Sequence, residues 1–139
     1  MIAEIMKLKL ILLAIAATTL FSNCMTNSKE SEISVTVQIN YGEQRTQRDT
    51  IITATTGITA LEALQYASSV ETHPKSRYVF VVSVDGVRGE RGVKAWYYTV
   101  NQQSTKKLAI NQPLQNGDVV TWIYKTDVCS CKVDLQQTN

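Results

Sequence analysis

The sequence predicts a small α+β domain in which one helix packs on a mixed β-sheet. Several segments alternate between apolar and polar residues or are rich in β-branched side chains, and turn signals separate them. A single short amphipathic segment lies among them. The composition, 44% hydrophobic and 19% charged over 139 residues, is typical of one ordinary globular domain.

The first two strands are predicted over residues 33–40 and 48–55. In the first, four aliphatic residues alternate with polar ones, which indicates one buried and one wet face. The second is rich in Thr and Ile, and residues 41–43 provide a turn between the two.

The helix is predicted from Thr59 to about Ser68. Thr59 and Glu62 fit a capping box, in which the Thr hydroxyl accepts from the N3 amide and the Glu carboxylate reaches back. Apolar residues spaced by three form its core face. Because the helix has barely three turns, we expect it to be stable only when packed on a sheet.

The remaining residues predict three further strands and one short one. The strands span 78–84, with little exposed face, then 95–100 and 119–124, and the short strand spans 106–110. Loops or turns are expected at 72–76, 85–86, 87–94, 101–105 and 116–118. Two strands, one helix and then three or four strands is the order of a β-grasp-like two-layer domain.

The N-terminus predicts a signal peptide over residues 1–23. Lys7 and Lys9 precede a nearly apolar run that is too short to span a membrane. The ending Leu20-Phe-Ser-Asn-Cys24 resembles the lipobox of bacterial lipoproteins, with Asn23 where Gly or Ala is usual. We therefore expect Cys24 to carry acyl chains such as palmitate. Two alternatives stay open: a plain secretory peptide with Cys24 as a free or disulfide-bonded thiol, and a cytoplasmic protein with a buried apolar N-terminal helix.

This interpretation divides the chain into four parts. After the signal peptide, residues 24–32 hold the lipidated cysteine and a tether, 33–125 form the domain, and 126–139 form a polar tail. The expected location is the extracytoplasmic cell envelope, with the membrane leaflet left open. Cleavage lowers the net charge from +2 to +1, which is too small to indicate nucleic-acid binding.

Residues 35–124 resemble a bacterial domain of unknown function related to the C-terminal domain of transcobalamin and intrinsic factor. The matching segments are 56–64 at the helix, 80–86, the Trp96-Tyr-Tyr-Thr-Val-Asn101 strand and 114–122. The resemblance implies a β-grasp fold, a secreted or surface location and a cobalamin-like ligand, which those proteins enclose with a large helical domain. Gln102 stands where the family usually has Gly, so a looser turn is expected there.

The aromatic strand supplies the candidate ligand-binding residues Trp96, Tyr98 and Asn101. Trp96 and Tyr98 share one face of the strand, and flat rings suit a planar ligand. The alternative is that this face packs under the helix, and core positions are expected for Trp122 and Tyr124. Basic residues near this strand could meet an anionic ligand or could simply be solvated: Arg88, Arg91, Lys94, Lys106 and Lys107.

Cys129 and Cys131 have three interpretations. They could hold Cu(I), form an easily reduced disulfide, or belong to an incidental tail or pair with another chain. The only histidine is His73, it lacks an evident catalytic partner, and no Gly-rich phosphate loop opens a helix. We therefore expect a protein that is not an enzyme and that has no resident metal or cofactor.

The leading functional hypothesis is a small membrane-anchored module that binds a planar or amphipathic molecule such as a corrinoid. A partner protein would complete the site, because one domain offers only one open face. The alternatives are an adhesive or protein–protein interaction module and a thiol- or copper-handling protein that uses the cysteine pair. The first hypothesis requires the rings at 96–98 to face solvent on at least one side.

Overall fold

A computed structural model describes residues 31–75 and 78–128 of the chain. The predicted signal peptide, Cys24, almost all of the tether and the Cys129–Cys131 pair lie outside these ranges. Within them, no helix is both long enough and apolar enough to cross a membrane.

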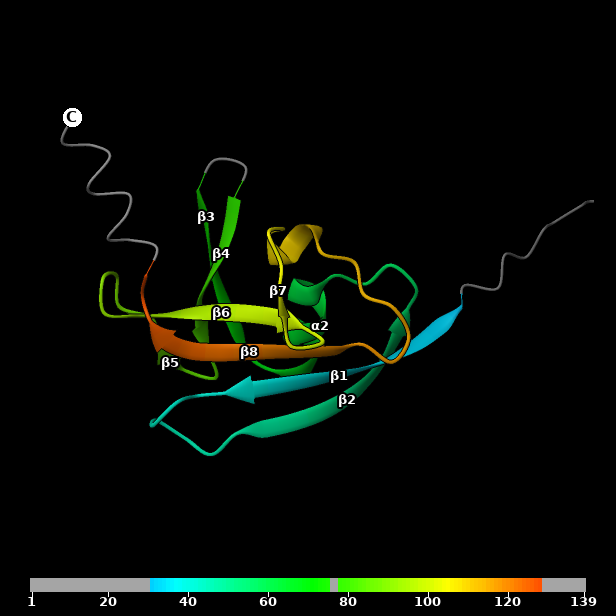
Figure 1. The fold of residues 1–139 in the computed structure, drawn as a ribbon, viewed down its shortest axis with the longest axis horizontal. Coiled ribbons are helices and arrows are strands. Elements are labelled where there is room, and N and C mark those ends of the chain that lie inside the picture. The colour runs from blue at the N-terminus through cyan, green and yellow to red at the C-terminus, as the bar shows by residue number, and fades with distance from the viewer. Residues whose placement is uncertain (1–30, 76–77, 129–139) are drawn as a thin grey trace, which may run out of the picture.

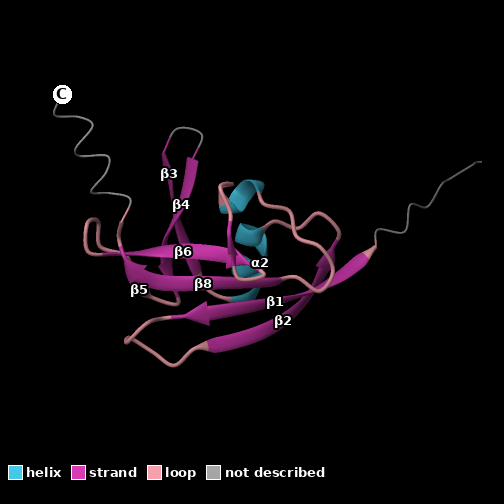
Figure 2. Cartoon of the chain, viewed as in Figure 1, coloured by secondary structure: helices cyan, strands magenta, loops and turns pink. Residues whose placement is uncertain are grey.

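The described residues form two β-sheets and one α-helix (Figures 1 and 2). The elements are β1 (Glu32–Asn40), β2 (Arg48–Thr55), α2 (Ala60–Ala67), β3 (Val70–Lys75), β4 (Tyr78–Val84), β5 (Val87–Arg88), β6 (Lys94–Val100), β7 (Gln103–Ser104), the 3-10 helix η1 (Ala109–Asn111) and β8 (Val119–Thr126). The larger sheet has the order β2-β1-β8-β6-β7, and the smaller has the order β3-β4-β5. The central pair β1–β8 is parallel and the other pairs are antiparallel. The predicted α+β, β-grasp-like class is therefore confirmed.

The core lies between α2 and one face of the larger sheet. Strand β1 alternates as predicted, because every second residue from Ile33 to Ile39 is buried. Helix α2 buries Ala60, Leu61, Ala63 and Leu64. Its capping box is present, since the Thr59 side chain accepts from the Glu62 amide and the Glu62 carboxylate accepts from the Thr59 amide.

Three predictions for local structure were wrong. Residues 72–76 were expected to be a loop, but residues through Lys75 belong to β3, where Pro74 is tolerated because β3 is an edge strand. The short strand expected over 106–110 is instead a loop that leads into η1. Residues 87–94 were expected to be an exposed loop, but they include β5, which pairs with β4.

The hairpin β3–β4 projects away from the larger sheet (Figure 1). A bulge lies in it, because Glu71 pairs with Ser83 while the next residue, Thr72, pairs with Val81. The extra residue on β4 reverses the alternation of side chains. As a result Val79 and Val81 pack against the core, as Val84 does.

Candidate functional site

Trp96 belongs to the core and does not present its ring to a ligand. Only 8% of the residue is exposed, and its indole N–H donates to the Val87 carbonyl oxygen at 2.9 Å. The ring packs edge-on against Tyr41 and at 5.2 Å from Tyr124. The candidate role of Trp96 in ligand contact is therefore corrected, because β5 and the β1–β2 end of the sheet cover this position.

Tyr98 lies on the same face of β6 and is half-buried. Its ring stacks on Trp122 with centroids 5.2 Å apart, and its hydroxyl donates to the Lys107 carbonyl oxygen. Burial raises the pKa of Tyr98, so the phenol stays protonated at neutral pH. Because one face stacks on Trp122 and the hydroxyl is bonded inside the domain, only the rest of the ring could meet a ligand.

Asn101 is a turn residue whose side-chain amide and carbonyl groups both make hydrogen bonds within the domain. Its amide donates to the Asp118 carboxylate at 2.8 Å, and its carbonyl oxygen accepts from the Val119 amide at 2.9 Å. Asn101 and Gln102 both have positive φ, of 50° and 65°, so the β6–β7 turn is tight. The looser turn expected from Gln102 is not found.

Trp122 and Tyr124 on the last strand, β8, are both in the core, as expected. The Trp122 indole N–H is buried and has no hydrogen-bond partner among the described residues. An unpaired buried donor costs about 1–3 kcal/mol. The burial of the Trp122 ring must therefore stabilise the fold by more than this cost.

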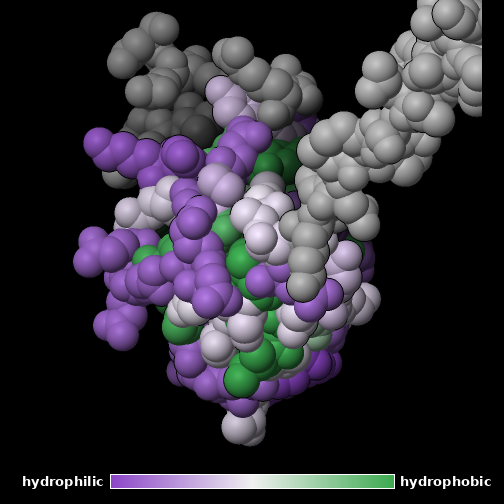
Figure 3. Space-filling view, turned by 90° about the vertical axis from the view of Figure 1, so that its right-hand side faces the viewer, coloured by the Kyte–Doolittle hydropathy of each residue, from purple (hydrophilic) through white to green (hydrophobic). Residues whose placement is uncertain are grey.

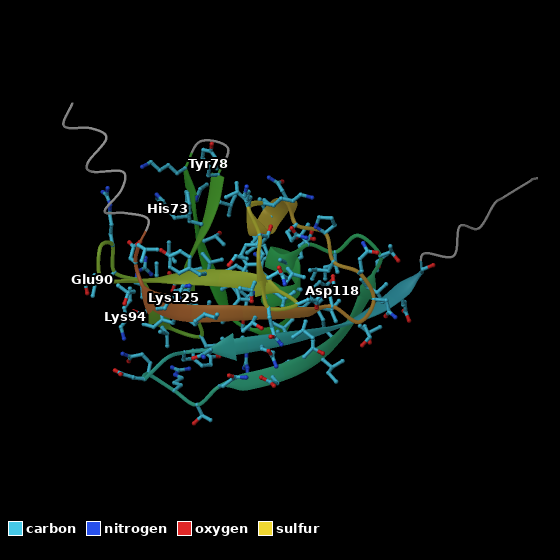
Figure 4. The ribbon with its side chains drawn as sticks, in the orientation of Figure 1. His73, Tyr78, Glu90, Lys94, Asp118 and Lys125 are labelled. Atoms are coloured by element: carbon cyan, nitrogen blue, oxygen red, sulfur yellow. The ribbon has the colours of Figure 1, made fainter. Side chains whose placement is uncertain are left out.

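Two of the basic residues near β6, Arg88 and Lys94, have separate partners. Arg88 pairs with Glu71 on the smaller sheet, while the Lys94 ammonium lies 5.7 Å from the centre of the Tyr124 ring. Figure 4 places Lys94 at one end of the larger sheet, together with Glu90 and Lys125. An acidic residue therefore accompanies the basic residues at this end, and the structure gives no support to a specific anion site there.

Tyr78 and Phe80 form the exposed aromatic surface that the sequence did not identify. They are 42% and 45% exposed, and their rings are tilted with centroids 6.2 Å apart. His73 pairs directly with Phe80 across the hairpin, and Figure 4 shows His73 and Tyr78 on it. The prediction that residues 78–84 have little exposed face was therefore wrong. The available signal was the Tyr78–Phe80 spacing of two, which puts both rings on one face.

Tyr41, Arg48 and Asp85 form a polar cluster that joins the two sheets. The Tyr41 hydroxyl donates to Asp85 at 2.5 Å, and the Arg48 guanidinium lies 3.0 Å from the same carboxylate. Burial, with the bond to Asp85, raises the pKa of Tyr41 to about 12. A phenol with such a pKa stays protonated, so the cluster is suited to holding the sheets together and unsuited to nucleophilic catalysis.

A hollow of about 250 Å³ lies between the end of β2 and helix α2. Its lining consists of Ala54, Thr55, Thr56, Gly57, Ile58, Glu62 and Tyr66. Figure 3 views the end of the molecule where β1 begins and β2 ends, and apolar residues gather in the middle of this face. Across residues 31–75 and 78–128, no three His, Cys, Asp or Glu side chains gather as metal ligands would.

Comparisons with known proteins agree with this fold. The family model described as "Domain of unknown function (DUF4430)" matches residues 56–126. A candidate metal-binding protein from Ruminococcus gnavus has a TM-score of 0.60 at 20% identity, over 68% of this chain and 98% of that one. Haptocorrin in complex with Cbi has a TM-score of 0.63 at 14% identity, over 71% of this chain and 26% of haptocorrin. No curated protein matched. At these identities the two structures establish the fold alone.

Proposed function

This chain belongs to the family of DUF4430 domains, and on that premise we propose that it is a small ligand-binding module for a planar, corrinoid-like molecule. The observation that carries the proposal is the exposed pair of rings at Tyr78 and Phe80. Aromatic rings provide a large contact area at low cost in conformational entropy. A planar ligand would lie across these rings on the outer face of the β3–β4 hairpin.

The shape of this surface favours a site that is shared with another protein. Ligand pockets usually bury most of the ligand's surface, whereas a projecting hairpin can cover only one side of it. Haptocorrin, which was crystallised with Cbi, matches this chain over 26% of its own length. By analogy, this domain would supply one wall of the site, and a partner protein would supply the other.

The proposed location is the extracytoplasmic face of a membrane, with Cys24 as the lipid-bearing residue. The proposal rests on the basic, apolar and lipobox-like segments that precede Cys24. Labelled palmitate should enter the wild-type protein in bacterial cells. Equal labelling of a Cys24→Ser variant would contradict the assignment.

The ligand test uses the full chain and cobinamide as the probe. Equilibrium dialysis followed by corrin absorbance measures binding directly, and it is preferable to tryptophan fluorescence because Trp96 and Trp122 are both buried. We expect saturable binding that weakens at least fivefold in Phe80→Ala and in Tyr78→Ala.

Tyr66→Ala is the matched control, because Tyr66 is an exposed tyrosine on another element. It should bind cobinamide as the wild type does. Binding that is undetectable in the wild type, or that all three variants weaken equally, would contradict the proposed site.

A second function, protein–protein interaction by strand addition, is favoured by the edge of β2. Among the strands that the structure describes, β2 pairs only with β1, and Ile51 at its middle is 73% exposed. An open edge can accept an extended segment of another protein. Thr36 directs its backbone groups toward β8, so its partner Ile51 directs its own N–H away from β1, at the open edge. Replacing Ile51 by Pro would remove this outward donor and block such pairing, so pull-down of a partner should be lost if this function holds.

A further inference from the structure

Glu62 and Tyr66 line two hollows beside helix α2. The larger, of about 250 Å³, extends toward the end of β2, and the smaller, of about 170 Å³, is lined by Glu62, Gln65 and Tyr66. Residues four apart in a helix lie on the same side. The carboxylate and the phenol ring therefore both border the same open space.

The carboxylate of Glu62 forms no ion pair with a basic side chain of residues 31–75 and 78–128. Its Oε2 atom accepts from both the amide and the hydroxyl of Thr59, each at 2.8 Å. These bonds hold the pKa of Glu62 below its usual value, so the group is ionised at neutral pH. The two ion pairs found among the described residues are Arg48–Asp85 and Arg88–Glu71, and Oε1 of Glu62 has no hydrogen bond there.

The ring of Tyr66 is 72% exposed, although it stands next to a concave surface. Its hydroxyl makes no hydrogen bond within the described part of the chain. Gly57 also lines the hollow, and a Cβ atom there would meet nothing within 4 Å. The space between the ring and the β2–α2 loop is therefore open to a small group.

We propose that this hollow binds the head group of an organic cation: a primary ammonium, a guanidinium or a quaternary ammonium. The Glu62 carboxylate would neutralise the charge, and the face of the Tyr66 ring would attract it through a cation–π contact. The hollow is smaller than the roughly 300–1,000 Å³ typical of drug-sized ligands. It therefore suits a group the size of a basic side chain and is too small for a corrinoid. This site is independent of the one proposed on β4.

The experiment is an NMR titration of the full chain in a maltoside detergent. The probes are choline chloride, N-acetyl-lysine methylamide and sodium chloride, at one ionic strength. We expect saturable shifts of the Gly57, Glu62 and Tyr66 amide signals with one or both organic cations and none with sodium. Tighter binding of choline indicates a free quaternary ammonium ligand, and tighter binding of the lysine derivative indicates the basic side chain of a peptide; either result supports the site.

Paired variants separate binding from folding. Glu62→Gln removes the charge but keeps a side chain that can complete the capping box, and it should weaken binding about two- to fivefold. Tyr66→Ala should weaken it by a similar factor, while Tyr66→Phe and the distant Glu43→Gln should leave it unchanged. Absence of saturable shifts, or wild-type binding by both Glu62→Gln and Tyr66→Ala, would overturn the inference. Loss of cobinamide binding in Phe80→Ala bears only on the β4 site.

Discussion

The aromatic residues of β6 and β4 differ in exposure, although both strands are rich in aromatic and β-branched residues. On β6, Trp96 is 8% exposed and bonded to Val87, and Tyr98 is stacked on Trp122. On β4, Tyr78 and Phe80 are each more than two-fifths exposed. The comparison shows that the neighbours of a strand, and not its own composition, decide whether its rings stabilise the fold or remain available for binding.

The physical cause is the face of each strand on which the rings lie, because each strand has one face against the core. Strand β6 pairs with β8 inside the larger sheet, and the core lies against one of its faces. Strand β4 belongs to a three-stranded sheet, and its bulge turns Val79 and Val81 toward the core. The same bulge leaves Phe80 and Tyr78 on the other side, where nothing in the described part of the chain buries them.

Removing a ring from the larger sheet should give the largest effect. Trp122→Ala leaves a cavity under Tyr98, and we expect the free energy of unfolding to fall by about 3–5 kcal/mol, measured by urea denaturation. Trp122→Phe is the control, because it keeps a ring and removes the indole N–H that has no partner. It should cost clearly less than the alanine variant. Equal losses in the two variants would mean that the ring does not pack as described.

The cluster that links the two sheets should make stability depend on alkaline pH. An unfolded tyrosine loses its proton near pH 10, whereas the pKa of Tyr41 is about 12 in the folded protein. The contribution of Tyr41 is therefore complete below pH 10 and is lost as the pH rises through 12. We expect the difference in unfolding free energy between the wild type and Tyr41→Phe to shrink by about 2 kcal/mol from pH 9 to pH 12.

The measurement for Tyr41 is a set of urea denaturation curves at pH steps between 9 and 12. Both proteins contain the same lysines, so the effect of lysine titration on stability cancels in the difference between their unfolding free energies. If the difference in unfolding free energy stays constant over this range, burial and the bond to Asp85 do not raise the pKa of Tyr41 in the folded protein.

Removing a ring from the hairpin should have a much smaller effect on stability. Phe80 contacts Tyr78 and pairs with His73 across the strands, and such cross-strand pairs contribute about 0.2–1 kcal/mol. Phe80→Ala should therefore lower the unfolding free energy by no more than about 1 kcal/mol, measured in the same urea assay. A loss as large as that of Trp122→Ala would mean that the hairpin rings are structural and would remove the contrast with β6.

The sequence predicted the elements whose signal is local. The alternation in β1, the capping box at Thr59 and the turn at Asp85–Gly86 all depend on residues close together in the chain. Strand β3 was missed because His73-Pro74 is typical of a loop, and only its place at a sheet edge makes Pro74 acceptable.

The candidate site was harder to predict, because exposure depends on contacts between distant residues. Burial of Trp96 requires Val87 and Tyr41, and exposure of Phe80 requires a bulge set by the pairing of β3 with β4. No pattern within the aromatic strand contains this information. The roles predicted for Cys24, Cys129 and Cys131 stay predictions, since these residues lie outside the described ranges.

The β4–β5 and β6–β7 turns differ in the residues that they place at positive φ. The β4–β5 turn has Asp85 and Gly86 at positive φ, and the β6–β7 turn has Asn101 and Gln102 there. Positive φ costs an ordinary L-residue roughly 1–2 kcal/mol, whereas glycine adopts it freely but loses more conformational entropy on folding. Gln102→Gly should therefore stabilise the protein by about 0.5 kcal/mol, and Gly86→Gln should destabilise it by a similar or larger amount, as thermal unfolding would show. If Gln102→Gly instead destabilises the protein, the Gln102 side chain supports the larger sheet in a way that the backbone geometry does not reveal.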